Sequence, residues 1–308
     1  MDTIQLRSHS PRRWTAYARA VTVAILAALA LLEARAMAPT GILYDFGSFW
    51  ASGDALRHGL DPYGVYPLTF IATQDGHPQP SPNLDPPVLL PLFAAFSLVD
   101  PQIDFGLWWA LSLLCYAVAC WLLLRRTSQL RDPLTLTWLA SSFALWGAVY
   151  NGQIYTQLLL LSVGAWLALR SQRSVLAGVL LGTLVAAKPN FAVWPMALFL
   201  AGSTMPALMA GATFLVLWAM PALLYSPIVY QEWLTVALGT DSFGGANGGT
   251  VFSLGRLIGH PEMTRTLGIP SAALLLAALA VWCLRRRGDA LTVSALALVV
   301  SLLASPVA

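Results

Sequence analysis

Long apolar segments recur along the whole chain and alternate with short polar stretches rich in arginine, proline and glycine. At ~1.5 Å per residue of helix, the longer segments match a hydrocarbon core of ~30 Å. They predict nine membrane-crossing helices, at 15–37, 104–124, 134–150, 155–169, 174–187, 190–202, 206–225, 268–284 and 290–304. Apolar and polar residues do not alternate in repeated strand-length segments, which argues against a closed barrel. The pattern predicts an all-α polytopic membrane protein with one helical bundle over residues 1–308.

The composition agrees with this pattern. Hydrophobic residues make up 57% of the chain and charged residues only 10%, which does not suit a soluble core with a wetted surface. The first apolar run is longer than the core of a signal peptide and lacks a convincing cleavage site, so we interpret it as a retained helix. The three cysteines lie inside apolar runs and indicate neither a disulfide nor a metal site.

The charged residues predict an orientation. Arginines gather in the segments RSHSPRRW, RRTSQLRD, RSQR and RRRGD, and a cytoplasmic N-terminus places all four on the cytoplasmic side. Ten acidic residues then lie outside: Asp45, Asp54, Asp61, Asp75, Asp85, Asp100, Asp104, Glu232, Asp241 and Glu262. Two external loops result, at about 38–103 and 226–267, and the first is expected to fold and to contain an interfacial helix at 86–99. We therefore expect a multi-pass protein of the inner (plasma) membrane whose active site faces outward.

Several classes of chemistry find no support in the sequence. It contains no P-loop, no GxGxxG after a strand, no HExxH and no paired cysteine motif. A nucleotide-sugar enzyme working from the cytoplasm would need a soluble domain, and no segment predicts one. We expect no nucleic-acid partner. If the protein uses a sugar donor, that donor should arrive in the membrane.

Five motifs, in order, carry a resemblance to a known family. They are YDFGSFW, LRHGLDPYG, LDPPVLLPLFAAF, YNGQIYTQLLLL and GVLLGTLVAAKPN. The chain resembles glycosyltransferase family 87, membrane-embedded enzymes of the GT-C fold, from Tyr44 to about Pro306. The resemblance implies transfer of a hexose such as mannose, or of a pentose, from a polyprenyl-phosphate sugar to an extracytoplasmic lipid or glycan acceptor. It implies no metal and no cofactor. Family members continue beyond a similar SP near the end, so we expect a shortened member.

Asp45 is the candidate catalytic base. A base must take the proton of the acceptor hydroxyl as its oxygen attacks the anomeric carbon. Asp45 follows the first apolar run, where the resemblance places the catalytic Asp, and burial among aromatic residues would raise its pKa. The alternative is that Asp45 caps a helix beginning near Phe46. Asp54 could instead pair with Arg57 or His58, and Asp61 precedes Pro62 and suits a turn.

Two cations are candidates for the leaving phosphate, which needs fixed positive charge. Lys188 is the only lysine of the chain and lies at the predicted outer end of a crossing, before Pro189. Its alternative role is a snorkelling anchor at a helix end. Arg256 follows the glycine-rich run FGGANGG, whose N–H groups could face a phosphate or substrate, although such runs are often only flexible.

Three further polar residues are candidates for substrate binding. Asn151 and Gln153 lie in YNGQIYTQ, where amide groups could orient sugar hydroxyls or support the base, although Asn151 with Gly152 is also a good turn sequence. Asp85 stands before Pro86 and Pro87 and could be a second acidic group of the site or the N-cap of the interfacial helix.

A lipid or polysaccharide transporter, resembling a flippase, is the competing class. Transporters need polar groups along a pathway at mid-membrane. The charged residues here gather at the two predicted surfaces instead. A non-catalytic scaffold would leave Lys188 and the Asp45 segment without a role.

Overall fold

The computed structural model describes residues 11–39, 41–74, 77–125, 131–239, 250–285 and 289–305, and these residues are mainly helical. The helices are α1 (Pro11–Ala36), α2 (Tyr44–Arg57), α3 (Leu90–Phe96), α4 (Pro101–Leu124), α5 (Pro133–Ala140), α6 (Phe143–Tyr150), α7 (Tyr155–Arg170), α8 (Ser174–Ala187), α9 (Val193–Leu200), α10 (Thr204–Leu224), α11 (Ile228–Gly239), α12 (Leu254–Leu257), α13 (Thr264–Arg285) and α14 (Ala290–Leu303). Short 3-10 turns include η1 (Pro87–Leu89) and η3 (Pro189–Ala192), and the two strands are β1 (Phe70–Gln74) and β2 (His77–Ser81).

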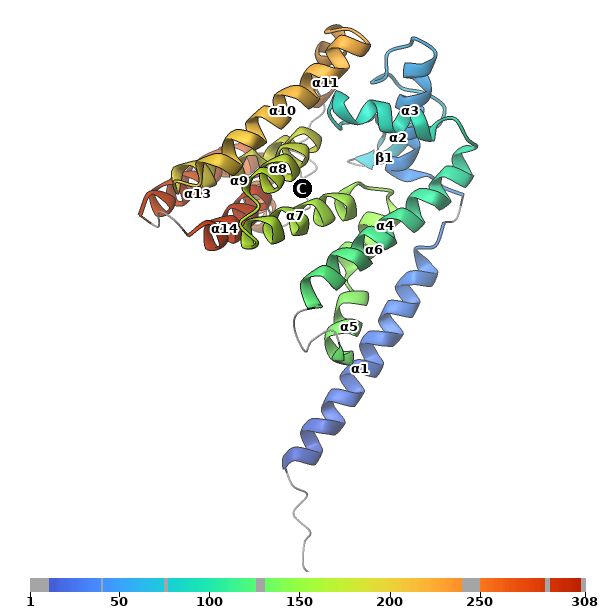
Figure 1. Ribbon diagram of the computed structural model, residues 1–308. Coiled ribbons are helices and arrows are strands. Elements are labelled where there is room, and N and C mark those ends of the chain that lie inside the picture. Colours follow the sequence, from blue (N-terminus) through green and yellow to red (C-terminus); the bar gives the residue numbers. More distant parts are fainter. Residues whose placement is uncertain are drawn as a thin grey trace, which may run out of the picture.

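The helices form two groups that meet where α4 packs against α7 (Figure 1). We call α2, α3 and β1 the cap. α8 packs between α7 and α10, while α9 packs against α10, α13 and α14. α1 packs against α5 and α6, and the Arg19 guanidinium donates to Asp132 at the start of α5. α2, α3 and β1 lie together at the top right of Figure 1, near the end of α10 and α11.

Four of the predicted crossings correspond to helices of sufficient length and apolar character, and the other predicted crossings differ from the structure. Thr15–Ala36, Pro101–Leu124, Thr204–Leu224 and Thr264–Arg285 are long and apolar enough to cross a membrane. The run 134–150 divides into α5 and α6, because two successive serines, Ser141 and Ser142, end one helix and begin the next. In the run 190–202, the 3-10 turn begun by Pro189 leaves α9 with 8 residues. α7, α8 and α14 match predicted runs but have 16, 14 and 14 residues. Nine full-length crossings are therefore not found among the described residues.

The close pairing of α8 with α10 depends on two glycines four residues apart. A Cβ on Gly178 would collide with Met209, and a Cβ on Gly182 would lie 2.5 Å from the carbonyl oxygen of Ala210. Small residues at this spacing let two helix backbones approach within a membrane. This contact fixes the axis of α8 and therefore the position of its last residues.

The first predicted external loop is folded, as expected, but its hairpin was not predicted. β1 and β2 pair antiparallel, with Phe70 opposite Ser81. Ser48 of α2 joins the ends of both strands, since its hydroxyl donates to the carbonyl of Ser81 at 2.7 Å and accepts from the amide of Phe70 at 3.0 Å. The predicted helix at 86–99 is present as η1 and α3. A Cβ on Gly53 would collide with the backbone of Phe93, so α2 and α3 also lie in close contact.

Candidate functional site

Five of the six predicted site residues line one cavity, which we call the polar cavity. Its volume is about 470 Å³. The five residues are Asp45, Asp85, Asn151, Gln153 and Lys188. They come from α2, the loop before η1, the turn between α6 and α7, and the end of α8. The fold therefore brings together residues that lie far apart in the sequence.

Asp45 faces the turn between α6 and α7. α2 begins at Tyr44, its N-cap is Leu43, and no side chain caps it, so the interpretation of Asp45 as a helix cap is wrong. The Gln153 side-chain amide donates a hydrogen bond to the Asp45 carboxylate instead. Gln153 is therefore in direct contact with the residue predicted to be the base.

Gly152 allows this approach between α2 and the turn. It has φ +70°, a conformation that glycine adopts without strain. A Cβ at Gly152 would lie only 2.5 Å from the Cβ of Phe46, and the amide of Phe46 donates to the carbonyl of Asn151 at 3.2 Å. The predicted turn at Asn151 and Gly152 is confirmed, and it also holds Gln153 against α2.

The backbone around Asp85 is fixed from three sides. The Tyr63 hydroxyl donates to the carbonyl of Asp85 at 3.0 Å, and the Asp85 amide donates to the Asn83 side chain at 2.8 Å. The Trp233 indole of α11 donates to the carbonyl of Leu84 at 3.0 Å. The N-cap of η1 is Pro86 without a side-chain cap bond, so the interpretation of Asp85 as a cap is also wrong.

Lys188 points toward Asp85 rather than toward a free surface. It follows the last residue of α8, its side chain is 18% exposed, and its ammonium lies 3.8 Å from Oδ1 of Asp85. The same ammonium lies 5.0 Å from the ring centroid of Tyr155. Sequence reasoning missed the role of Tyr155, since an aromatic residue beginning an apolar run gives no sign of a cation contact.

The surroundings of the cavity shift the pKa values of Asp45, Asp85 and Lys188. Burial raises the pKa of Asp45, the hydrogen bond from Gln153 opposes that rise, and the charge of Asp85 adds to it. Burial also raises the pKa of Asp85, against the influence of Lys188. Burial lowers the pKa of Lys188, but Asp85 and Tyr155 outweigh it and leave that pKa above its ordinary value. Lys188 therefore stays charged at neutral pH, while Asp45 is a stronger base than a solvated carboxylate.

Two buried polar atoms beside the cavity have no hydrogen-bond partner within the described residues. They are Oδ2 of Asp85 and Nδ2 of Asn83, and their residues are only 4% and 1% exposed. Buried polar atoms of folded proteins nearly always have a hydrogen-bond partner, so these two atoms are exceptions. Asp85 is one of the residues that line the polar cavity, whereas its Oδ2 is enclosed among the neighbouring residues.

The other candidates lie elsewhere. The side chain of Arg256 and the run FGGANGG fall outside the described residues. Asp54 pairs with Arg57 at 3.6 Å and with His58 at 3.5 Å, and Asp61 accepts from the amide of Tyr63 at 2.8 Å, which confirms their predicted local contacts. Across the described residues, no three His, Cys, Asp or Glu side chains form a group that could hold a metal ion.

Comparison with known proteins gives one match. The sequence model of glycosyltransferase family 87 matches residues 83–306, which is most of the chain. No curated protein and no solved structure matches this sequence. The match begins after Asp45, so the first two motifs lie outside it, whereas Asp85, Gln153 and Lys188 lie inside. Family membership indicates a glycosyltransferase that meets its sugar donor and acceptor in a membrane setting. The chain belongs to glycosyltransferase family 87.

Proposed function

We propose that this member of the family has the GT-C fold and transfers a hexose, such as mannose, or a pentose from a polyprenyl-phosphate sugar to an extracytoplasmic lipid or glycan acceptor. One observation carries the proposal. The Asp45 carboxylate, held by Gln153, and the Lys188 ammonium line the same cavity. A base for the attacking hydroxyl and a cation for the leaving phosphate are the two groups that this transfer requires.

The proposed reaction is one displacement at the anomeric carbon. The acceptor oxygen forms a bond to that carbon while its proton passes to Asp45. The bond from the anomeric carbon to the phosphate oxygen breaks, and its electron pair stays on the polyprenyl phosphate. Lys188 stabilises the charge that develops on this leaving group, because a fixed cation in a partly buried site interacts strongly with an anion.

Three residues have supporting roles in this proposal. Gln153 orients the Asp45 carboxylate, and its hydrogen bond limits the rise of the Asp45 pKa. Asn151 lines the cavity beside them and can bond a sugar hydroxyl. Asp85 positions Lys188, whose ammonium lies 3.8 Å from Oδ1, and its carboxylate belongs to the lining of the cavity, where it can meet a second hydroxyl. Arg256 stays a candidate for the phosphate on sequence grounds alone.

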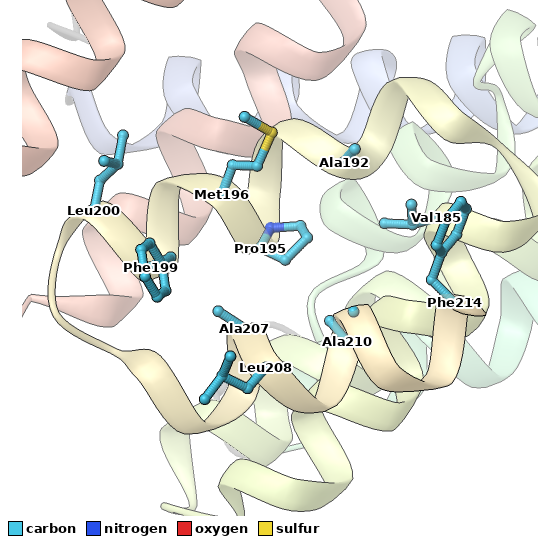
Figure 2. A pocket seen from close by; sticks show the side chains of 11 residues that line it. Val185, Ala192, Pro195, Met196, Phe199, Leu200, Ala207, Leu208, Ala210 and Phe214 are labelled. Carbon is cyan, nitrogen blue, oxygen red and sulfur yellow. The ribbon is translucent and has the colours of Figure 1, made fainter. Parts of the chain in front are cut away.

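A second cavity suits the apolar chain of such a donor. It has a volume of about 400 Å³ and lies between α9 and α10 (Figure 2); we call it the α9/α10 cavity. Its labelled residues are apolar, including Met196, Phe199 and Phe214. Val185 and Ala192, three residues before and four residues after Lys188, also line it. A phosphate at Lys188 therefore has apolar space nearby for its chain.

The charge pattern supports an extracytoplasmic position for the polar cavity and a cytoplasmic N-terminus in the inner (plasma) membrane. Impermeant maleimide labelling of intact cells tests this topology. A cysteine at His58, which is 61% exposed, should react from outside, whereas one at Ser171, in the turn after α7, should react only after lysis. The reverse result would invert the proposed orientation.

The activity itself is tested by incubating the purified protein in nanodiscs with a panel of radiolabelled polyprenyl-phosphate sugars and an extract of cell-envelope lipid and glycan. We expect label to pass from one donor to an extractable acceptor, and only when that donor carries the correct sugar. Unchanged donors throughout the panel, with protein that stays folded, would contradict the proposal.

A further inference from the structure

The residue before the proposed base has an unusual backbone conformation. Tyr44, the first residue of α2, has φ +45°, in the left-handed region that a bulky side chain rarely adopts. Among the described residues, one other non-glycine residue has a positive φ, Gln172 in the exposed turn after α7. A strained conformation of this kind persists only where surrounding contacts hold it. The contacts of Tyr44 therefore show what maintains the start of α2.

Tyr44 is held by two aromatic residues from other elements. Its hydroxyl shares a hydrogen bond with the hydroxyl of Tyr150, the last residue of α6, and the two ring centroids lie 4.3 Å apart. On another side, the ring centroid of Phe70, the first residue of β1, lies 5.5 Å from that of Tyr44. We call Tyr44 and Tyr150 the tyrosine pair. It connects the start of α2 to the end of α6.

The tyrosine pair lies beside the two residues whose contact forms the proposed base. One of its members directly precedes Asp45, and the other lies three residues before Gln153, which donates to the Asp45 carboxylate. The next backbone contact between these segments is the bond from the Phe46 amide to the Asn151 carbonyl, at 3.2 Å. Neither tyrosine belongs to the described lining of the polar cavity. The pair therefore reaches the site through Asp45 and Gln153.

We propose that the tyrosine pair is a positioning element, which holds the left-handed start of α2 and thereby directs the Asp45 carboxylate toward Gln153. This inference rests on the proposed function, in which Asp45 is the base. The φ angle of Tyr44 sets the direction in which the chain enters α2. If the pair is broken, relaxation of this angle turns the first residues of α2 and weakens the bond from Gln153.

Removal of single hydroxyl groups tests the pair. Tyr44→Phe and Tyr150→Phe keep the rings and lose the hydrogen bond, so each should lower kcat by about fivefold, the equivalent of one ordinary hydrogen bond. The KM for the donor should stay near the wild-type value, because neither tyrosine lines the cavity. Tyr66→Phe is the matched control: the Tyr66 hydroxyl donates to the carbonyl of Asp61 at 2.6 Å, in the loop before β1. It should leave kcat unchanged.

The pH profile separates positioning from stability. The hydrogen bond from Gln153 lowers the pKa of Asp45, as does the charge of Lys188, whereas burial and the charge of Asp85 raise it. Weakening the Gln153 bond should therefore move the acid limb of kcat to higher pH in Tyr44→Phe. Gln153→Ala should shift the limb in the same direction. The double variant should show no further shift, because the bond through which the pair acts is already lost.

Chemical labelling of Asp45 gives a result that does not depend on transfer. Dicyclohexylcarbodiimide adds to protonated carboxyl groups, and peptide mapping distinguishes Asp45 from Asp85. In phosphatidylcholine nanodiscs, the midpoint of Asp45 labelling against pH should be higher in Tyr44→Phe than in the wild type, while the midpoint of Asp85 should stay in place. A shifted midpoint in a protein that uses no donor would contradict the proposed function and leave the positioning role standing.

Glycine and alanine at position 44 test the strain directly. Glycine adopts φ +45° without strain, whereas alanine does not. Both Tyr44→Gly and Tyr44→Ala lose the ring and the hydroxyl. Tyr44→Gly should nevertheless melt at the higher temperature, which reverses the usual order of these two residues in a helix. The usual order would show that the left-handed conformation is not what the pair maintains.

Three further results would overturn the inference. A lower melting temperature of Tyr44→Phe, with unchanged kcat and an unmoved acid limb, would reduce the pair to a structural contact. A raised KM with unchanged kcat would place the Tyr44 hydroxyl against the substrate. Additive shifts of the acid limb in the double variant with Gln153→Ala would show that the pair does not act through Gln153.

Discussion

The polar cavity and the α9/α10 cavity are similar in size, about 470 and 400 Å³, and opposite in chemistry. The first has two carboxylates, two amides and an ammonium in its lining, while the described lining of the second has no charged or hydroxyl side chain. Volume therefore does not distinguish the proposed reaction site from the space proposed for hydrocarbon. What distinguishes them is the presence of polar atoms held in place by other polar atoms, as Asp45 is by Gln153.

The two cavities also differ in how the chain builds them. The α9/α10 cavity is lined by residues between 185 and 214, and most of them belong to two consecutive helices. The polar cavity joins segments from residue 45 to residue 188. Its chemistry depends on long-range contacts such as those of Gly152 with α2 and of Trp233 with the Asp85 loop.

The largest expected effect comes from Asp45→Asn. Asparagine keeps the shape of the side chain and removes the base, so transfer should fall by roughly 10²–10⁴. Radiolabel transfer in nanodiscs measures this loss. An Asn variant with full activity would contradict the catalytic role and direct attention to Asp85.

Thermal unfolding of the same variant gives an independent result. Because burial raises the pKa of Asp45 in the folded protein, its charge costs stability at neutral pH, and that cost disappears as the pH falls through the raised pKa. Asp45→Asn should therefore be at least as stable as the wild type at neutral pH. The difference in melting temperature between them should shrink in acid.

The next largest effect is expected for Lys188→Ala. Loss of the cation should reduce transfer by about 10²–10³, whereas Lys188→Arg, which keeps the charge, should retain more activity. Lys188→Ala also leaves Asp85 as a buried carboxylate without its ion pair, which should cost about 3–5 kcal/mol of stability.

A double variant separates these two consequences. Lys188→Ala combined with Asp85→Asn should recover the melting temperature, because no buried charge is left unpaired, and should stay inactive. Recovery of both stability and transfer would reduce Lys188 to a structural partner of Asp85.

A smaller effect is expected when a side chain fills the α9/α10 cavity. Gly211 lines the α9/α10 cavity, and a Cβ there would meet no atom within 4 Å. Gly211→Leu should lower transfer from a long-chain donor about five- to tenfold through lost burial of the chain. It should not change transfer from a short-chain donor, and Gly211→Ala serves as the control. Equal loss with both donors would remove the cavity from the donor site.

The smallest expected effect is a shift in pH dependence. Transfer needs ionised Asp45, so the rate should fall as the pH drops through its raised pKa. Burial is the main cause of that rise, and the charge of Asp85 adds to it. Asp85→Asn should therefore move the acid limb of kcat/KM to lower pH, as measured by a pH–rate profile. A limb that moves to higher pH would contradict the proposed interaction.

The sequence predicted helices well where proline, glycine or arginine ends an apolar run, and α8 matches its predicted range, 174–187. It did not predict the break at Ser141 and Ser142, because serines inside an apolar run are compatible with a continuous helix. The hairpin was missed because Pro78 and Pro80 argue against a strand. In addition, the hydrogen bonds of Ser48 with Ser81 and Phe70, which connect the two strands, involve a residue from a distant part of the chain.

The candidate site also combines residues that the sequence predicted with contacts that it did not predict. Residue type and motif context identified Asp45, Asp85, Gln153 and Lys188 as candidates, and all four line one cavity. The ion pair between Lys188 and Asp85 and the contact with Tyr155 could not be predicted. They depend on the crossing of α8 with α10, which brings the end of α8 to the cap.

The short helices that carry the site also have a consequence for the surrounding lipid. α6, α7 and α8 have 8, 16 and 14 residues, so at ~1.5 Å per residue each is shorter than a hydrocarbon core of ~30 Å. We expect the bilayer to thin around this side of the protein, which is one way in which short hydrophobic helices relieve a mismatch. Host lipids with short acyl chains match the length of these helices better than lipids with long chains. If Asp45 is the base, as proposed, we expect the thickness of the membrane to affect how readily substrates reach it.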